Sequence, residues 1–143
     1  MNICDAIPHR PPFLLVDEIV AMEGNTIRTR KLTAPGDALF NGHFPGYPLM
    51  PGVLICEAIV QSGAILIAHL TQDPIGDRIP VLTRISNAKF KRPVRPGDTL
   101  DMEVTLKEKL GGAYFMQGVA RVTGSVAASI EFACATTDKK GLH

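Results

Sequence analysis

The longest apolar stretch of the chain covers residues 53–70, and few polar side chains interrupt it. Pro51 suits the first position of a helix, because its missing N–H is not needed there. Asp73-Pro74 would stop the same helix. The pattern therefore predicts a helix from Pro51 to about Thr71, roughly 30 Å long at about 1.5 Å per residue. Because this helix is apolar on nearly every face, other elements must cover it all round.

The same stretch is nearly long enough to cross a bilayer. Its polar interruptions include Glu57, Gln61 and His69. A carboxylate in the middle of a membrane span is costly, which favours a buried helix in a water-soluble core. We therefore expect no membrane span.

Short β-rich runs, separated by glycine and proline, lie on both sides of the predicted helix. In one of them Leu100, Met102, Val104 and Leu106 alternate with other residues, which is typical of a strand with one buried face. Residues 34–51 are rich in proline and glycine and should form a loop. Antiparallel sheets contain strands with this glycine spacing, and a sheet wrapped around one long helix is an α+β fold. We expect strands at residues 13–21, 25–32, 80–92, 100–107, 114–122 and 126–135.

Length and composition fit one domain over residues 1–143, with a tail at 138–143 that we expect to fray. Apolar residues make up 45% of the chain and charged residues 20%, which argues against extensive disorder. The 15 basic and 14 acidic residues give a net charge of +1, which argues against a dedicated nucleic-acid binder. Cys4, Cys56 and Cys134 suggest a reducing compartment. Because residues 1–5 lack a signal-peptide pattern, we expect a cytoplasmic protein.

The candidate chemistry lies where the loop meets the helix. His43 sits in a loop that three prolines stiffen, and a histidine can act as a general base near neutral pH. The backbone N–H groups of Gly52 and Val53 have no partner inside the predicted helix, and they lie at the positive end of its dipole. Two such N–H groups could stabilise an oxyanion.

Glu57 lies less than two turns into the helix and shares one face with Val53 and Gln61. A carboxyl group among apolar side chains tends to keep its proton, because burial disfavours the charged form, and it can then act as an acid. Gln61 could hydrogen-bond to this carboxyl group and orient it. An acid, a base and an oxyanion site together suit proton abstraction beside a carbonyl, followed by loss of a β-hydroxyl group.

Each of these residues also has a structural interpretation. A single loop histidine such as His43 is more often structural than catalytic, and Gln61 could simply satisfy polar groups in the core. Glu57 is harder to explain in this way, because a carboxyl group in an apolar helix needs a partner. Cys56 is next to Glu57 but points about 100° away, so we interpret it as a core residue.

A long motif covers this junction: Gly42-His43-Phe44-Pro45-Gly46, Pro48, Met50-Pro51-Gly52-Val53-Leu54, Glu57-Ala58 and Gln61. It resembles the signature of the FabZ-type β-hydroxyacyl-[acyl-carrier-protein] dehydratases. Residues 8–17, 89–94 and 96–100 resemble other segments of that family, so the similarity covers most of the chain. The resemblance implies a hot-dog fold, in which a curved antiparallel sheet wraps one long helix. It also implies a homodimer or a trimer of dimers, with the catalytic histidine and glutamate supplied by different subunits.

The resemblance also implies roles for five residues. His43 matches the catalytic base, and Glu57 matches the catalytic acid. Gly52 and Val53 match the residues whose backbone N–H groups donate to the thioester carbonyl. Gln61 matches the residue that orients the acid. The implied reaction removes water from a (3R)-hydroxyacyl thioester to give the trans-2-enoyl product, without a metal or an organic cofactor. In a variant of this mechanism the histidine acts as both base and acid while Glu57 holds a water molecule.

The charge pattern is consistent with an acyl carrier protein as the partner, because such carriers are acidic. Between residues 78 and 97 the chain has no acidic residue and carries six basic ones, namely Arg78, Arg84, Lys89, Lys91, Arg92 and Arg95. Two other functions remain open at this point. A hot-dog thioesterase would release a free thiol instead of an enoyl product, and a non-catalytic acyl-binding module would not depend on Glu57.

Overall fold

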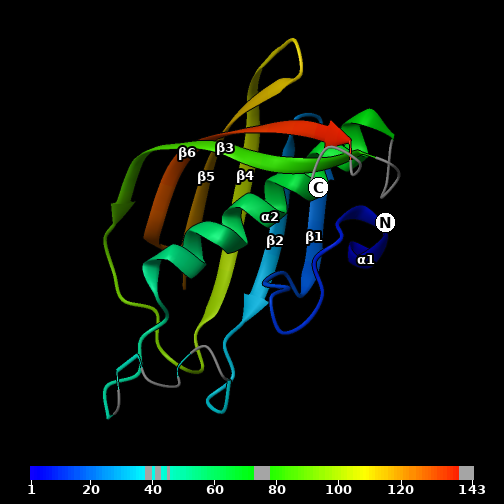
Figure 1. Ribbon diagram of the computed structural model, residues 1–143. Coiled ribbons are helices and arrows are strands. Elements are labelled where there is room, and N and C mark those ends of the chain that lie inside the picture. Colours follow the sequence, from blue (N-terminus) through cyan, green and yellow to red (C-terminus); the bar gives the residue numbers. More distant parts are fainter. Residues whose placement is uncertain (38–39, 41–42, 45, 73–77, 139–143) are drawn as a thin grey trace.

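The computed structural model describes residues 1–37, 40, 43–44, 46–72 and 78–138. Its strands form one six-stranded antiparallel sheet in the order β1-β2-β4-β5-β6-β3, so that β1 and β3 are the two edges (Figure 1). The elements are α1 (Ile3–Ala6), β1 (Glu18–Glu23), β2 (Thr26–Leu32), α2 (Gly52–Thr71), β3 (Arg78–Phe90), β4 (Thr99–Leu110), β5 (Ala113–Val122) and β6 (Ser125–Asp138).

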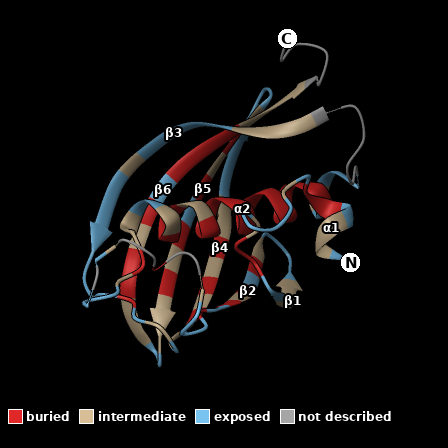
Figure 2. Ribbon diagram, turned by 60° about the horizontal axis from the view of Figure 1, so that its bottom comes forward, coloured by how far each residue is buried: buried red, intermediate tan, exposed pale blue. Residues whose placement is uncertain are grey.

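The curved sheet wraps around α2, and the buried residues lie on α2 and on the strands that face it (Figure 2). In α2 almost every residue from Ile55 to Ala68 is buried. The helix comes very close to the middle of the sheet at Gly118 of β5, where a Cβ atom would overlap Cγ2 of Ile59. A glycine is therefore required for this contact. The predicted α+β class and the hot-dog fold are both confirmed.

Helix α2 is long and apolar enough to cross a membrane by length and composition alone, but 72% of its most apolar window is buried inside the protein. This burial agrees with the prediction of a core helix. The expectation that other elements cover the helix all round is wrong at its first turn, where Val53 is 74% exposed. The uncovered turn is the one that carries the candidate oxyanion donors.

The main errors of the sequence prediction lie in the N-terminal segment and at the element ends. Residues 13–17 do not form a strand, because Gln61 on α2 accepts the N–H of Leu15. The short helix α1 was not predicted, and Pro51 lies just before the first helical residue. Asp138 belongs to β6, whereas the rest of the predicted frayed tail, residues 139–143, lies outside the described residues.

Candidate active site

Gln61 is fully buried in α2 and holds the side chain of Glu57, which lies one turn earlier. Its Oε1 accepts the N–H of Leu15 at 2.8 Å, and its Nε2 donates to the carbonyl oxygen of Phe13 at 2.8 Å. These two backbone groups fix which way the amide points, because one can only donate and the other can only accept. The second proton on Nε2 is donated to Oε2 of Glu57 at 2.9 Å.

This hydrogen bond distinguishes the two oxygens of the Glu57 carboxyl group. Since Oε2 accepts from an amide N–H, the proton of the neutral acid belongs on Oε1. Within the described residues, Oε1 makes no hydrogen bond. The Glu57 side chain keeps 24% of its surface exposed in the single chain. The geometry therefore leaves Oε1 as the atom that can give a proton to a ligand.

The imidazole ring of His43 is held through one of its two nitrogens, and the other nitrogen is free. Its Nδ1 lies 3.0 Å from the carbonyl oxygen of Leu49, which can only accept, so the proton belongs on Nδ1. The Leu49 N–H in turn donates to the carbonyl oxygen of His43 at 2.8 Å. Phe44 stacks on the imidazole ring with 4.2 Å between centroids. This tautomer leaves the lone pair of Nε2 available to accept a proton.

The N-terminus of α2 has unused hydrogen-bond donors. Pro51 is the N-cap residue and offers no side-chain cap, while its carbonyl oxygen accepts from Leu54 at 3.0 Å. No hydrogen bond from the N–H of Gly52 or Val53 is formed within the described residues. Phe90 of β3 packs directly on Gly52, where a Cβ atom would lie 2.8 Å from Cε1 of the ring.

A groove of about 460 Å³ joins the histidine to the helix tip. Its wall includes His43 and Gly52, the apolar ring of Phe90, and the cations Lys91 and Arg92. This groove therefore combines a free imidazole nitrogen, a backbone donor at the positive end of a helix dipole, and an apolar surface. It can bind a carbonyl group and remove a proton beside it.

Glu57 does not line this groove, and no hydrogen bond or ion pair joins it to His43 within the described residues. The single chain thus carries two half-sites, one with His43 and Gly52 and the other with Glu57 and Gln61. The imidazole beside Glu57 is that of His9, whose Nε2 lies 3.8 Å from Oε2. The sequence reasoning gave His9 no role. The only signal for it was its place in the N-terminal segment that resembles the dehydratase family.

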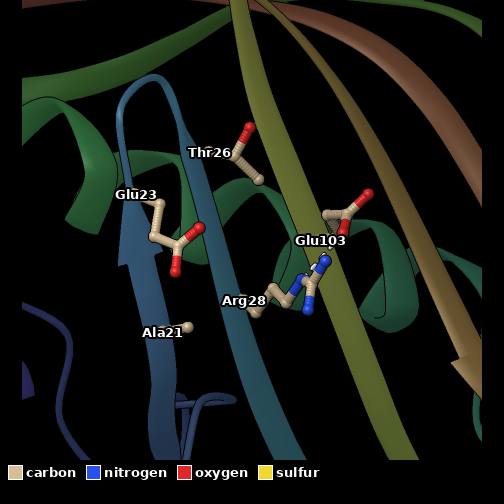
Figure 3. Close-up of a pocket in the computed structure, with 5 residues that line it drawn as sticks. All are labelled: Ala21, Glu23, Thr26, Arg28 and Glu103. Atoms are coloured by element: carbon tan, nitrogen blue, oxygen red, sulfur yellow. Dashed lines mark hydrogen bonds and ion pairs between the residues drawn. The ribbon is translucent and has the colours of Figure 1, made fainter.

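Another hollow, of about 340 Å³, lies on the face of the sheet that points away from α2 (Figure 3). Arg28 of β2 and Glu103 of β4 point toward each other in it and form an ion pair of 2.9 Å. None of its lining residues belongs to either half-site. Arg28 and Glu103 are already paired with each other, and the other described residues that line this hollow offer no acid–base pair.

Comparisons with known proteins show which family this chain resembles in sequence. The model of the FabA-like domain family matches residues 7–131. The 3-hydroxyacyl-[acyl-carrier-protein] dehydratase FabZ of Anaeromyxobacter dehalogenans (strain 2CP-C) is 42% identical over 142 residues, which cover 98% of this chain and 91% of the relative.

Two solved structures illustrate the range of proteins with this fold. The dehydratase heterocomplex ApeI:P from Xenorhabdus doucetiae superposes with a TM-score of 0.84 at 14% identity, over 99% of this chain and 95% of the other. A hypothetical thioesterase with coenzyme A from Streptococcus pneumoniae TIGR4 superposes with a TM-score of 0.67 at 12% identity, over 85% of each chain. At these identities the likeness concerns the fold alone.

Proposed function

This chain belongs to the FabA-like domain family, and from that premise we propose that it is a hydro-lyase of fatty acid biosynthesis. It removes water from a (3R)-hydroxyacyl-[acyl-carrier-protein] and releases the trans-2-enoyl thioester. The observation that carries the proposal is the groove in which the free Nε2 of His43 lies near the unpartnered N–H of Gly52. Proton abstraction beside a thioester carbonyl needs these two groups together.

In the proposed mechanism, Nε2 of His43 takes the proton from C2 of the substrate. The N–H groups of Gly52 and Val53 stabilise the enolate-like oxygen that forms on the thioester. Oε1 of Glu57 gives its proton to the C3 hydroxyl group as the C3–O bond breaks, so that water leaves and the C2–C3 double bond forms. Gln61 orients the acid by holding Oε2. In the alternative with one residue as base and acid, His43 returns the proton while Glu57 holds a water molecule.

The two half-sites support a homodimer in which His43 of one protomer faces Glu57 of the other. Strand β3 is an edge of the sheet, and exposed edges commonly pair with another strand. It exposes three large apolar side chains, of which Phe90 also lines the groove beside His43, and the other two are Leu82 and Ile85. Pairing of two β3 edges would bury these side chains, with Phe90 beside the groove. A trimer of such dimers keeps the same shared site.

A hybrid dimer tests whether the site is shared. We expect His43→Ala and Glu57→Gln to be inactive separately. If they are co-expressed with different tags and purified through both tags, each hybrid has one intact site out of two, so it should regain about half of the wild-type activity. Inactive hybrids would mean that His43 and Glu57 act within one chain or not together.

The acyl carrier protein is the proposed donor of the substrate. Lys91 and Arg92 line the groove and are exposed, as are Lys89 and Arg95 nearby. The predicted basic patch also includes Arg84, which is exposed on β3, and Arg78, whose side chain lies outside the described residues. An acidic carrier would approach this rim of the groove with favourable electrostatics.

Charge reversal tests the carrier. Lys89→Glu combined with Arg95→Glu, two exposed cations outside the groove lining, should raise KM for the hydroxyacyl carrier protein severalfold and leave KM for a short hydroxyacyl pantetheine thioester nearly unchanged. The effect on the carrier should weaken as salt is added. A matched control is Lys109→Glu at the far end of β4, which should affect neither substrate. Equal changes for both substrates would remove the support for a carrier at this surface.

The central experiment follows the product of a (3R)-hydroxyacyl carrier protein. We expect enoyl product from the wild type and a loss of about 10²–10⁴-fold in rate for Glu57→Gln and for His43→Ala. Glu108→Gln, an exposed carboxylate on β4, and His69→Ala, an exposed histidine on α2, are matched controls that should keep the wild-type rate. Folding of each variant is checked by its melting temperature.

The same experiment separates the two other functions. Free thiol without enoyl product would identify a thioesterase, because a hypothetical thioesterase shares this fold. Binding of the acyl chain without turnover, equal in wild type and Glu57→Gln, would identify a non-catalytic acyl-binding module. Either result would reject the proposed dehydratase.

A further inference from the structure

The N-terminal segment between α1 and β1 is anchored tightly beside Glu57. Ile7, Leu15 and Val16 are almost completely buried. The guanidinium group of Arg10 ties the segment together by donating to the carbonyl oxygens of Ile7, Cys4 and His9 at 2.7–2.9 Å. Burial and hydrogen bonds therefore both hold the backbone of this segment in place.

His9 is the residue of this segment that faces the candidate acid. Its Nε2 lies 3.8 Å from Oε2 of Glu57, and the two side chains are only 26% and 24% exposed. Phe13 stacks against the imidazole ring with 6.3 Å between centroids. The other ring nitrogen, Nδ1, is buried and has no hydrogen-bond partner within the described residues.

The surroundings of His9 favour its neutral form with the proton on Nε2. Burial lowers the pKa of His9, Arg10 lowers it further, and Glu57 opposes them. A neutral imidazole has a single N–H group. Because Nδ1 faces no acceptor whereas Nε2 faces a carboxylate oxygen, the tautomer with Nε2–H is the more stable one.

We propose that His9 is a positioning residue for Glu57, holding Oε2 from one side while Gln61 holds it from the other. With two N–H donors directed at Oε2, the transferable proton stays on Oε1, the oxygen left for the substrate. The distance of 3.8 Å is longer than a hydrogen bond, and such contacts commonly shorten when a substrate is bound. This inference rests on the proposed dehydratase function and adds a residue to its acid half-site.

Two substitutions distinguish the effect of the His9 N–H group from the effect of the size and flatness of its ring. His9→Phe keeps a flat ring for stacking on Phe13 but removes the donor, and we expect kcat to fall about tenfold with KM nearly unchanged. His9→Gln places a neutral amide N–H near the position of Nε2, and we expect it to restore kcat to within about threefold of wild type. His69→Phe, on the exposed surface of α2, is the matched control and should leave kcat unchanged.

Combination with Glu57→Gln shows whether His9 acts through the acid. If it does, adding His9→Phe to Glu57→Gln should lower the remaining rate by less than about twofold, because the group it positions is already absent. Melting temperatures and the oligomeric state of each variant show whether the fold is kept.

The possible outcomes are distinct. Wild-type kcat in His9→Phe, an equal loss in His9→Phe and His9→Gln, or a full further loss in the Glu57→Gln background would each overturn the role of His9. Those results leave the dehydratase intact as long as Glu57→Gln and His43→Ala are impaired. A wild type that forms no enoyl product would instead reject the proposed function itself.

Discussion

The amide of Gln61 donates to Oε2 of Glu57 at 2.9 Å, one turn apart on α2, while the same amide is clamped by the backbone of residues 13 and 15. The candidate acid is thereby connected to the N-terminal segment, although that segment is distant in sequence. Loss of this amide would affect both the fold and the acid, and the two effects can be measured separately.

We expect Gln61→Leu to lower the free energy of unfolding by about 2–4 kcal/mol, because it leaves the buried N–H of Leu15 and the partly buried carbonyl oxygen of Phe13 unpaired. It should also lower kcat, since Glu57 loses its orienting donor. Ser62→Ala is the matched control: its buried hydroxyl group bonds to Thr29 and not to the acid, so it should cost stability without lowering kcat. Urea unfolding and steady-state kinetics measure the two effects. Equal kcat values for Gln61→Leu and wild type would contradict the orienting role.

The backbone N–H group of residue 52, at the first turn of α2, can be removed by a single substitution. Gly52→Pro deletes the N–H at a position where proline suits a helix, whereas Gly52→Ala keeps the N–H and crowds Phe90 in a similar way. We expect the proline variant to have a kcat about 10²–10³-fold below that of the alanine variant. Similar kcat values for the two would exclude Gly52 as an oxyanion donor.

The close approach of α2 to the sheet predicts a coupled pair of substitutions. Gly118→Ala should destabilise the protein by about 1–3 kcal/mol, because its methyl group would overlap Ile59. Combined with Ile59→Ala, it should cost less than the sum of the single variants. Gly112→Ala, where the added methyl group meets nothing within 4 Å, is the control. Additive losses in chemical denaturation would show that the two residues do not compete for space.

The environment of His9 predicts a pH effect on stability. Burial lowers its pKa in the folded protein, so the unfolded chain binds the proton more readily, and the folded state loses stability as the pH falls through the ordinary histidine value of about 6.5. His9→Gln cannot titrate. Between about pH 7.5 and about pH 5.5, its free energy of unfolding should therefore fall less than that of the wild type. An equal fall in both proteins would show that His9 does not contribute.

The cysteines should differ in reactivity. Burial raises the pKa of Cys56, and burial together with nearby Glu57 raises the pKa of Cys134 to about 12, so both remain thiols near neutral pH. Cys4 is partly exposed. A thiol reagent should label Cys4 first and reach the other two only on unfolding, as followed by mass spectrometry. Rapid labelling of Cys56 in the folded protein would contradict its assignment to the core.

Local pattern predicted most of the elements. The helix over residues 51–71 was evident because its apolar run has no proline after Pro51, and glycines marked the turns before β5 and β6. The prediction failed at residues 13–17, which are as apolar as a strand. Their burial comes from packing on α2, and Gln61 takes the place of a neighbouring strand as the hydrogen-bond partner of Leu15.

The sequence by itself determined the helix face shared by Glu57 and Gln61, because residues four apart on a helix are neighbours whatever surrounds them. Only the tertiary structure decided that His9 lies beside Glu57 and that His43 does not. These placements depend on how a loop and an N-terminal segment dock on α2, through contacts between residues far apart in the chain, and no local periodicity encodes them.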